Sequence, residues 1–276
     1  MLINKIPRKM ARMTFPLFML VSGCATNIAV RNTEIRSRDI PKEFDGSVIV
    51  FVSDFHINRL LPMEYFEEVI DKINGLEPDV VLLGGDYVDW DTMDMDEAFR
   101  MLSRLPQGKT YGVLGNHDNW FRFFPMKQSL QDSGIILLQN DSVRFAGSGG
   151  DFVIAGIDDY LSGRPDIDKA LSGVTEKDFC VLLSHSPQPY STVKDDTRVN
   201  VMLAGHSHGG QVTFFGLWAP ILPLDAKTYW RGRYDSEGNF LLITNGIGTN
   251  KLPIRIFARP AIERIVLKRE TQERGD

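Results

Sequence analysis

Several residue types that define whole classes of protein are scarce in this chain of 276 residues. The two cysteines, Cys24 and Cys180, are too few for a disulfide framework. Acidic residues exceed basic ones by 36 to 31, and a net charge of -5 does not favour a nucleic-acid partner. A serine nucleophile of the α/β-hydrolase kind is not expected, because the one Gly-x-Ser-x-Gly match, Gly205-His206-Ser207-His208-Gly209, falls inside a cluster of histidines described below. The overall composition of the chain, with 43% hydrophobic and 24% charged residues, is typical of a globular domain.

The first two dozen residues differ from the rest of the chain. Four basic residues and no acidic one precede a short apolar run over 13–21, which leads into Val21-Ser22-Gly23-Cys24. This order is typical of a signal peptide. Small residues before a cysteine resemble the lipobox of bacterial lipoproteins, which implies cleavage before Cys24, its acylation, and a membrane-anchored protein facing the periplasm or cell exterior. The alternative is an uncleaved N-terminal anchor reaching about Val30, although a spanning helix needs about 20 apolar residues.

Apolar patterns along the remaining chain predict alternating strands and helices, then a strand-rich last third. Six apolar residues recur at helical spacing and predict an amphipathic helix that starts near Pro62: Tyr65, Phe66, Val69, Ile70, Ile73 and Leu76. A weaker helix is expected over 97–105, and an edge strand within 31–43. Together these patterns indicate a layered, mixed α/β fold. The expected strands are 48–52, 80–83, 110–114, 135–138, 152–157, 179–183, 199–203, 211–215, 240–244 and 262–268.

Five of these strand-like runs end in a short cluster of polar residues and glycines. The carboxyl ends of strands in an α/β sheet share one edge, so the five clusters can meet there. All five histidines of the chain lie in these clusters, beside aspartate and asparagine, whereas random scatter would leave several in helices and surface loops. The clusters contain Asp54 and His56, Asp86 and Asp89, Asn116 and His117, His185, and His206 with His208.

The chemistry of these side chains predicts a pair of metal ions. Imidazole with carboxylate and amide oxygen suits Mn, Fe, Zn, Ni or Co rather than Ca or an iron-sulfur cluster. Three or four ligands per ion, from seven candidates, require two ions that share a bridging ligand. Two ions about 3.5–4 Å apart can hold a hydroxide between them and clamp the oxygens of a phosphoryl group during in-line attack.

Together the clusters resemble the five-block signature of the calcineurin-like metallophosphoesterase superfamily. The motifs are Asp54-x-His56, Gly85-Asp86-x-x-Asp89, Gly115-Asn116-His117-Asp118, His185 and Gly205-His206-x-His208. The resemblance implies a four-layer α-β-β-α sandwich with mixed sheets over residues 44–268. Residues 1–23 would then be the signal peptide, 24–43 a tether with an edge strand, and 269–276 a charged tail.

The resemblance also implies a role for each site residue. Asp54, His56 and His208 would hold the first metal, and Asn116, His185 and His206 the second, with Asp86 bridging both. His117 would face the substrate, stabilise the transition state and protonate the leaving oxygen. Asp89 would pair with His117 and orient it; the alternative is that Asp89 caps a loop.

The sequence departs from the protein serine/threonine phosphatases in one respect. Their Arg-Gly pair is replaced by Trp90-Asp91, so the chain is not expected to act on phosphoproteins. The segment Gly209-Gly210-Gln211-Val212 and a later Arg255 are instead similar to a bacterial membrane-associated subfamily of phosphodiesterases and UDP-2,3-diacylglucosamine pyrophosphatase-like proteins. Arg255 is a candidate phosphate contact, or else a surface arginine.

Apolar segments follow two of the motif blocks, at 120–124 and 214–224. They would either pack inside the sandwich or, if exposed, form an apolar rim suited to an amphiphilic or lipid-linked phosphoester. Membrane topology bears on that choice, because a lipoprotein faces away from the cytosol, where the lipid A precursor is made. A catalytically silent metal-binding or scaffold protein on the same fold is the alternative function, and it predicts gaps among the ligands. The oligomeric state does not follow from the sequence.

Overall fold

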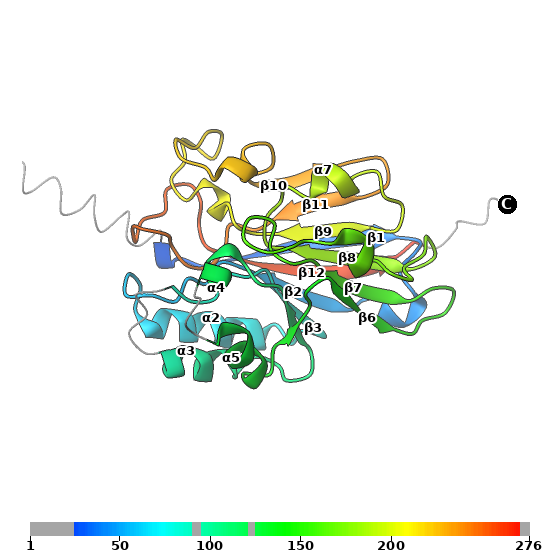
Figure 1. Cartoon of the computed structure of the whole chain (residues 1–276), viewed down its shortest axis with the longest axis horizontal. Coiled ribbons are helices and arrows are strands. Elements are labelled where there is room, and N and C mark those ends of the chain that lie inside the picture. The colour runs from blue at the N-terminus through cyan, green and yellow to red at the C-terminus, as the bar shows by residue number, and fades with distance from the viewer. Residues whose placement is uncertain (1–24, 90–94, 121–124, 271–276) are drawn as a thin grey trace, which may run out of the picture.

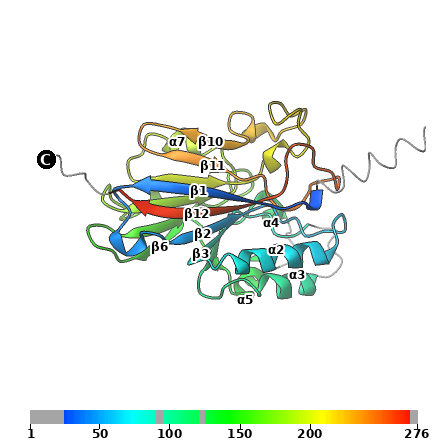
Figure 2. The ribbon, with the colours of Figure 1, turned by 180° about the vertical axis from the view of Figure 1, so that it is seen from behind.

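Alternating side chains of the buried strands pack into two different cores. In β2 (Val48–Val52), Val50 and Val52 contact the core beneath a layer of helices, whereas Ile49 and Phe51 face a core between two sheets. The computed structural model, which describes residues 25–89, 95–120 and 125–270, therefore has helices outside two stacked sheets (Figures 1 and 2). The predicted four-layer sandwich with mixed sheets is confirmed.

The first sheet has six strands in the order β1-β12-β2-β3-β4-β5. Strands β2 to β5 are parallel, and β12 runs antiparallel to β2 but parallel to β1. The expected edge strand is present as β1, although it ends before the 3-10 turn Lys42–Phe44. The other bounds are β1 (Ala29–Ser37), β12 (Ala261–Arg269), β3 (Val80–Leu83), β4 (Thr110–Gly112) and β5 (Ile136–Leu137).

The second sheet also has six strands, in the order β10-β11-β9-β8-β7-β6. The four central strands are parallel, and the two edge strands are antiparallel to their neighbours. In the central strand over 179–184, Cys180 is fully buried in the core on the outer face of this sheet. The bounds are β6 (Asp141–Phe145), β7 (Phe152–Gly156), β8 (Phe179–Ser184), β9 (Val201–Ala204), β10 (Gly232–Asp235) and β11 (Phe240–Ile243).

Helices cover the outer face of each sheet. The first sheet is covered by α2, α3 and α5, and the second by the one-turn helices α6 and α7. Helix α2 buries five of the six apolar side chains whose spacing predicted it, and it ends at Gly75, before the half-buried Leu76. No helix among residues 25–89, 95–120 and 125–270 is long and apolar enough to cross a membrane. The bounds are α2 (Met63–Gly75), α3 (Met95–Leu102), α4 (Asn116–Trp120), α5 (Met126–Asp132), α6 (Ile167–Ala170) and α7 (Tyr190–Val193).

One predicted strand is wrong. Residues 211–215 form isolated bridges, Val212 with Ile256 and Phe214 with Trp218, rather than a strand of either sheet. The reason is local, because Gln211 and Phe215 both have positive φ angles, 48° and 53°, which break an extended conformation. This segment is therefore a surface loop. The predicted signal peptide, Cys24 included, lies outside the described residues, as do 121–124 of the first apolar segment and 271–276 of the tail.

Candidate metal centre

The five polar clusters meet at the carboxyl ends of the parallel strands. The loops after β2, β3 and β4 supply Asp54, His56, Asp86 and Asn116 from the first sheet, and those after β8 and β9 supply the remaining histidines from the second. All seven proposed metal ligands are buried, none with more than 8% of its surface exposed. The structure therefore brings together the residues that the sequence selected, in the order and pairing expected.

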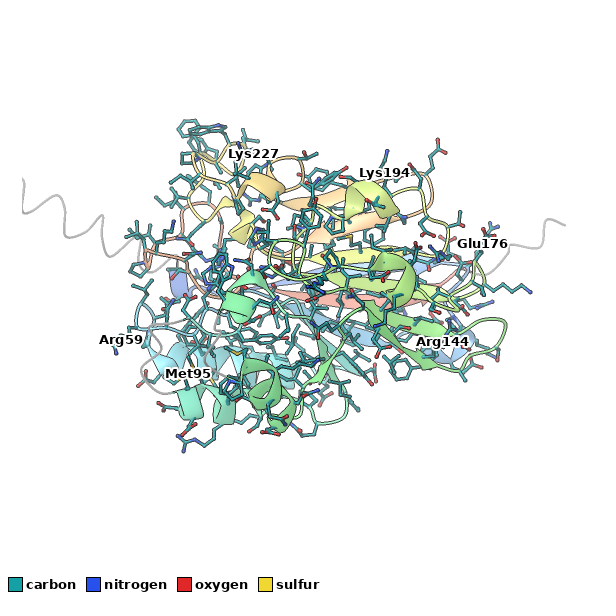
Figure 3. All side chains as sticks on the ribbon, in the orientation of Figure 1. Arg59, Met95, Arg144, Glu176, Lys194 and Lys227 are labelled. Atoms are coloured by element: carbon teal, nitrogen blue, oxygen red, sulfur yellow. The ribbon has the colours of Figure 1, made fainter. Side chains whose placement is uncertain are left out.

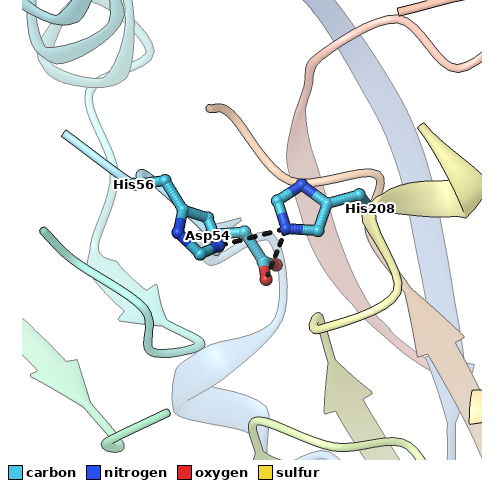
Figure 4. Close-up of side chains that lie close together, drawn as sticks. All are labelled: Asp54, His56 and His208. Atoms are coloured by element: carbon cyan, nitrogen blue, oxygen red, sulfur yellow. Dashed lines mark hydrogen bonds and ion pairs between the residues drawn. The ribbon is translucent and has the colours of Figure 1, made fainter. Parts of the chain in front are cut away.

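The first group consists of Asp54, His56 and His208, one ligand atom of each lying within 4.8 Å of the others. Figure 4 shows their side chains converging from the loop after β2 and from the 3-10 turn His208–Gly210. The Nε2 atoms of the two histidines are 3.1 Å apart, and the Nε2 of His208 is 3.7 Å from a carboxylate oxygen of Asp54. Two imidazole nitrogens and a carboxylate thus point at one spot.

The second group consists of Asp86, His185 and His206, with Asn116 beside them. The Nε2 atom of His185 lies 3.1 Å from Nδ1 of His206 and 3.1 Å from Oδ1 of Asn116. Both nitrogens and the amide oxygen can donate a lone pair to a cation placed among them. This is the second ligand set that the family resemblance implied.

Asp86 lies between the two groups. One oxygen, Oδ2, is 3.3 Å from Nε2 of His56 in the first group and 3.3 Å from Nε2 of His185 in the second. Its other oxygen accepts a hydrogen bond from the backbone N–H of His117 at 2.9 Å. A single carboxylate within reach of both clusters is the arrangement that a shared ligand requires, so the donor set fits a pair of divalent ions.

The backbone of the ligand loops is strained. Five of the seven proposed ligands have positive φ angles, although none is a glycine: Asp54, His56, Asp86, His206 and His208. Such conformations cost about 1–3 kcal/mol each and cluster at functional sites. The glycines between them are needed for close approach, since a Cβ on Gly205 would lie 2.4 Å from a carboxylate oxygen of Asp54. The strain is consistent with loops shaped to aim side chains.

Three of the histidines are oriented by a partner on the nitrogen that faces away from the centre. Nδ1 of His56 lies 2.9 Å from Oδ1 of Asp89, and Nδ1 of His185 lies 2.7 Å from the carbonyl of Gly84. Nε2 of His206 lies 3.0 Å from Oδ1 of Asp225. A proton on the outer nitrogen leaves the inner one free to bind a metal. Asp225 was not among the sequence candidates because it lies 17 residues after His208, in an apolar loop.

The charges of the two groups are strongly coupled. Burial disfavours the charge on His56, but the hydrogen bonds and charges of Asp86 and Asp89 outweigh it and raise the pKa of His56 well above its usual value. The pKa of Asp86 is correspondingly held well below its usual range, because the two neighbouring histidines outweigh its burial. Burial, with the nearby His56 and Arg255, lowers the pKa of His208, so that this imidazole is neutral and able to bind a metal.

His117 and Asp89 are paired as the sequence analysis expected. Nδ1 of His117 lies 2.7 Å from Oδ1 of Asp89, the same oxygen that holds His56. Asn58 donates to the second oxygen at 3.0 Å, and these contacts outweigh burial and depress the pKa of Asp89. His117 is the most exposed of the five histidines, and its ring packs 4.8 Å from that of Trp120.

Asp118 has a structural role that the sequence analysis did not identify. Its carboxylate accepts hydrogen bonds from the backbone N–H groups of Asp86, Tyr87 and Gly115 at 2.8, 3.0 and 2.8 Å. Burial and the charge of Asp86 raise its pKa to about 7. Asp118 thus ties the loops after β3 and β4 together. Its position beside His117 in the Gly-Asn-His-Asp block was the available signal.

Arg255 is neither a phosphate contact nor a surface residue, so both alternatives for it are wrong. Its side chain is fully buried, and it donates hydrogen bonds to the backbone carbonyls of Gly248, Asn245 and Ala258. It also reaches the carbonyl of His208 at 3.2 Å, and Nη2 lies 3.3 Å from Nδ1 of that ring. The guanidinium therefore supports the loop of a proposed metal ligand.

The geometry agrees with comparisons to known proteins. The family model of calcineurin-like phosphoesterases matches residues 47–210, a range that spans all the proposed ligands. The chain is 33% identical over 243 residues to the uncharacterized metallophosphoesterase YkuE of Bacillus subtilis, covering 85% of this chain and 83% of YkuE. The chain belongs to the calcineurin-like phosphoesterase family. This phosphoesterase is accordingly a metal-dependent hydrolase of phosphoester bonds.

Two further relatives define how far the similarity extends. A transmembrane protein with a metallophosphoesterase domain from Danio rerio is 29% identical over 87% of this phosphoesterase, which spans 57% of that protein. The structure of a candidate 5'-nucleotidase from Staphylococcus aureus shares 11% identity and a TM-score of 0.53 over 84% of this chain and 56% of its own. At that identity, the similarity shows the fold alone.

Cys180, the cysteine within the described part of the chain, is not placed to act as a nucleophile. Burial raises the pKa of the Cys180 thiol to about 12, so that it is protonated at neutral pH. Cys180 also faces the core outside the second sheet, away from the histidine cluster. The seven proposed ligands show no gap of the kind that a silent scaffold protein predicts.

Proposed function

We propose that the enzyme holds two divalent ions and hydrolyses a phosphomonoester or phosphodiester by in-line attack. The observation that carries this proposal is the position of Asp86, 3.3 Å from a histidine of each ligand group. Asp54, His56 and His208 would hold one ion, Asn116, His185 and His206 the other, and Asp86 both. When bound, the ions supply an activated water and neutralise charge on the phosphoryl oxygens. The donor set suits Mn, Fe, Zn, Ni or Co.

His117 is the proposed catalytic side chain that is not a ligand. It is partly exposed and lies beside the first group, with its ring 4.6 Å from that of His56. Asp89 fixes the ring through Nδ1, which leaves Nε2 to face the phosphoryl group and donate a proton to the leaving oxygen. Because Asp89 also holds His56, it would keep the proton donor and a metal ligand in a constant relative position.

An amphiphilic phosphoester, such as a phospholipid or nucleotide-linked lipid, is the proposed class of substrate. The 214–224 segment, which could have packed into the core, has six exposed large apolar side chains. This supports the apolar-rim alternative of the sequence analysis. The N-terminal sequence supports a lipoprotein anchored to a membrane and facing the periplasm or cell exterior, with an uncleaved anchor as the alternative.

Hydrolysis of model esters tests this proposal. Bis-p-nitrophenyl phosphate and p-nitrophenyl phosphate distinguish diester from monoester activity, with Mn²⁺ or a chelator added. We expect Asp86→Ala to abolish turnover and His117→Ala to lower it by about 10²–10⁴-fold without loss of metal. The exposed Lys194→Ala serves as a matched control and keeps full activity. Turnover that survives both chelation and Asp86→Ala would contradict the proposal.

A further inference from the structure

Large apolar side chains are concentrated on two neighbouring surface loops. Leu217 has 83% of its surface exposed, Phe214 and Phe215 have 64% each, and Trp218 has 63%. The second loop adds Leu252 and Phe257, at 58% and 50%. Side chains of this size are normally exposed singly on a soluble domain. We call these six residues the apolar loop surface; they are Phe214, Phe215, Leu217, Trp218, Leu252 and Phe257.

Backbone hydrogen bonds hold the two loops together. Thr213 donates to the carbonyl of Ile256 at 3.0 Å, and Ile256 donates to that of Gln211 at 2.9 Å. The rings of Phe215 and Phe257 contact each other, with centroids 4.9 Å apart. Phe215 and Phe257 both have a φ of 53°, a backbone conformation in which glycine is the favoured residue. The backbone conformation therefore does not explain why an aromatic residue stands at either position. The apolar side chains are thus presented on a defined platform.

The N-terminal segment of the described chain lies beside the same surface. Arg259, two residues after Phe257, donates to the backbone carbonyl and the side chain of Asn27 at 3.1 and 2.6 Å. Figures 1 and 2 both place the start of the described chain at the end of the molecule that carries these loops. The described chain therefore begins beside the apolar loop surface.

The local charge has the opposite sign to that of the whole chain. Apart from the buried Arg255 and from Arg233, which pairs with Asp235, the segments 209–234 and 246–260 contain four basic residues and one acidic residue, although the chain has a net charge of -5. Lys227 and Lys251 are exposed, and Figure 3 shows Lys227 at the end that carries the loops, with Lys194 farther along the molecule. Exposed apolar groups within a basic rim are complementary to a bilayer that contains anionic lipids.

Both loops connect directly to the metal-binding groups. The first loop begins at Gln211, three residues after His208. The second loop contains Arg255, which donates a hydrogen bond to the backbone carbonyl of His208. We infer that the apolar loop surface inserts into the headgroup region of an anionic lipid bilayer, so that the phosphoesterase site is held next to that membrane. An N-terminal anchor alone would not need this contact between the loops and the bilayer, and neither would the proposed hydrolysis of a phosphoester.

The depth of a fluorophore in the bilayer tests this inference. The full chain, carrying Cys24→Ser so that only the fully buried Cys180 remains beside an introduced cysteine, is reconstituted into vesicles of phosphatidylcholine and phosphatidylglycerol. A nitrobenzoxadiazole probe is attached at Leu217→Cys or, as the matched control, at Lys194→Cys. We expect blue-shifted emission and strong quenching by nitroxide-labelled lipids at 217, and water-exposed emission without quenching at 194. Adding Lys227→Glu and Lys251→Glu should decrease the quenching at 217.

Two results would overturn the inference. The first is a probe at 217 that is as exposed to water as the probe at 194. The second is a blue shift at 217 without lipid quenching, in a protein that sediments as a dimer, because a second copy of the chain would then cover the surface. The double variant Leu217→Asp with Leu252→Asp, which changes one residue on each loop, should lose the bilayer contact yet hydrolyse soluble bis-p-nitrophenyl phosphate at the parent rate. The fluorescence test needs no activity, so its outcome is separable from that of the proposed function.

Discussion

At the scale of single residues, one carboxylate oxygen of Asp89 joins a metal ligand to the proposed proton donor. It lies 2.9 Å from Nδ1 of His56 and 2.7 Å from Nδ1 of His117. Groups of this kind set the tautomer and direction of a ligand, and replacing them commonly costs 10–100-fold in metal affinity or rate. Asp225 does the same for His206 alone. The two carboxylates therefore allow orientation of a ligand to be separated from orientation of the catalytic histidine.

We predict that Asp89→Asn lowers both Mn²⁺ affinity and the turnover number at saturating Mn²⁺, each by roughly 10–100-fold. An amide oxygen cannot serve two donating imidazoles as well as a carboxylate does. The matched variant Asp225→Asn should lower Mn²⁺ affinity and largely recover its turnover number at saturating metal. Steady-state kinetics against metal concentration checks both. Equal turnover numbers for the two variants at saturation would contradict a role for Asp89 in orienting His117.

Arg255 leads to a prediction about stability. Its guanidinium satisfies buried carbonyls of Gly248, Asn245 and Ala258, and Arg255→Met leaves these acceptors without that donor. At about 1 kcal/mol or more for each unsatisfied buried group, we expect a loss of roughly 3 kcal/mol in the free energy of unfolding. The exposed Arg233→Met, which removes a surface ion pair with Asp235, should cost less than about 1 kcal/mol. Denaturant unfolding measures both, and equal losses would show that Arg255 has no special structural role.

At the scale of secondary-structure elements, the loops at the strand ends are packed too closely to accept extra atoms. Gly205 follows β9, and a Cβ there would lie 2.1 Å from Oγ of Ser53 and 2.4 Å from the Asp54 carboxylate. Gly75, at the end of α2, has no atom within 4 Å of such a Cβ. The first glycine is required by the site, whereas the second is not.

We therefore predict that Gly205→Ala destabilises the fold by about 1–3 kcal/mol and displaces Asp54. Metal content should fall with it. Gly75→Ala should be neutral or stabilising by up to about 1 kcal/mol, because alanine is the better helix residue. Thermal unfolding together with metal analysis of the purified variants checks this pair. Full metal content in Gly205→Ala would contradict the close packing described for the loop.

The sequence predicted the strands and helices that have a regular apolar pattern, and it predicted the metal ligands that lie directly after such strands. The alternation in β2 and the helical spacing in α2 each specify a buried face, and the histidines beside strand ends specified the site. The strand expected at 211–215 was wrong because Gln211 and Phe215 have positive φ angles that break an extended conformation, and an apolar pattern alone does not reveal them. Arg255 and Asp225 could not be placed, since their partners lie 47 and 19 residues away in sequence.

At the scale of the whole molecule, folding brings buried opposite charges together. The stability of the fold, the protonation of the buried histidines and the affinity for metal therefore depend on one another. In the metal-free protein, burial disfavours the charge on His185 but Asp86 outweighs it and raises the pKa to about 10. The ordinary value is about 6.5. The proton on His185 therefore stabilises the fold fully below about pH 6.5, and this contribution is lost as the pH rises toward 10.

Metal binding requires neutral His185, so it must release that proton. We predict that Mn²⁺ affinity rises by up to about tenfold per pH unit between pH 6.5 and 10, and that bound metal restores the stability lost there. Titration calorimetry in two buffers of different ionisation enthalpy counts the protons released. The exposed-site control, Lys194→Ala, should show the same release. An affinity that does not change with pH would contradict the coupling between His185 and Asp86.

The central claim is that seven side chains from two sheets hold a pair of ions. Anomalous diffraction from crystals of the Mn²⁺-loaded protein tests it most directly. The account predicts two peaks about 3.5–4 Å apart, with Asp86 contacting both, and neither peak fully occupied in Asp86→Ala. A single peak, or ions bound away from Asp54, His56, Asn116, His185, His206 and His208, would contradict it.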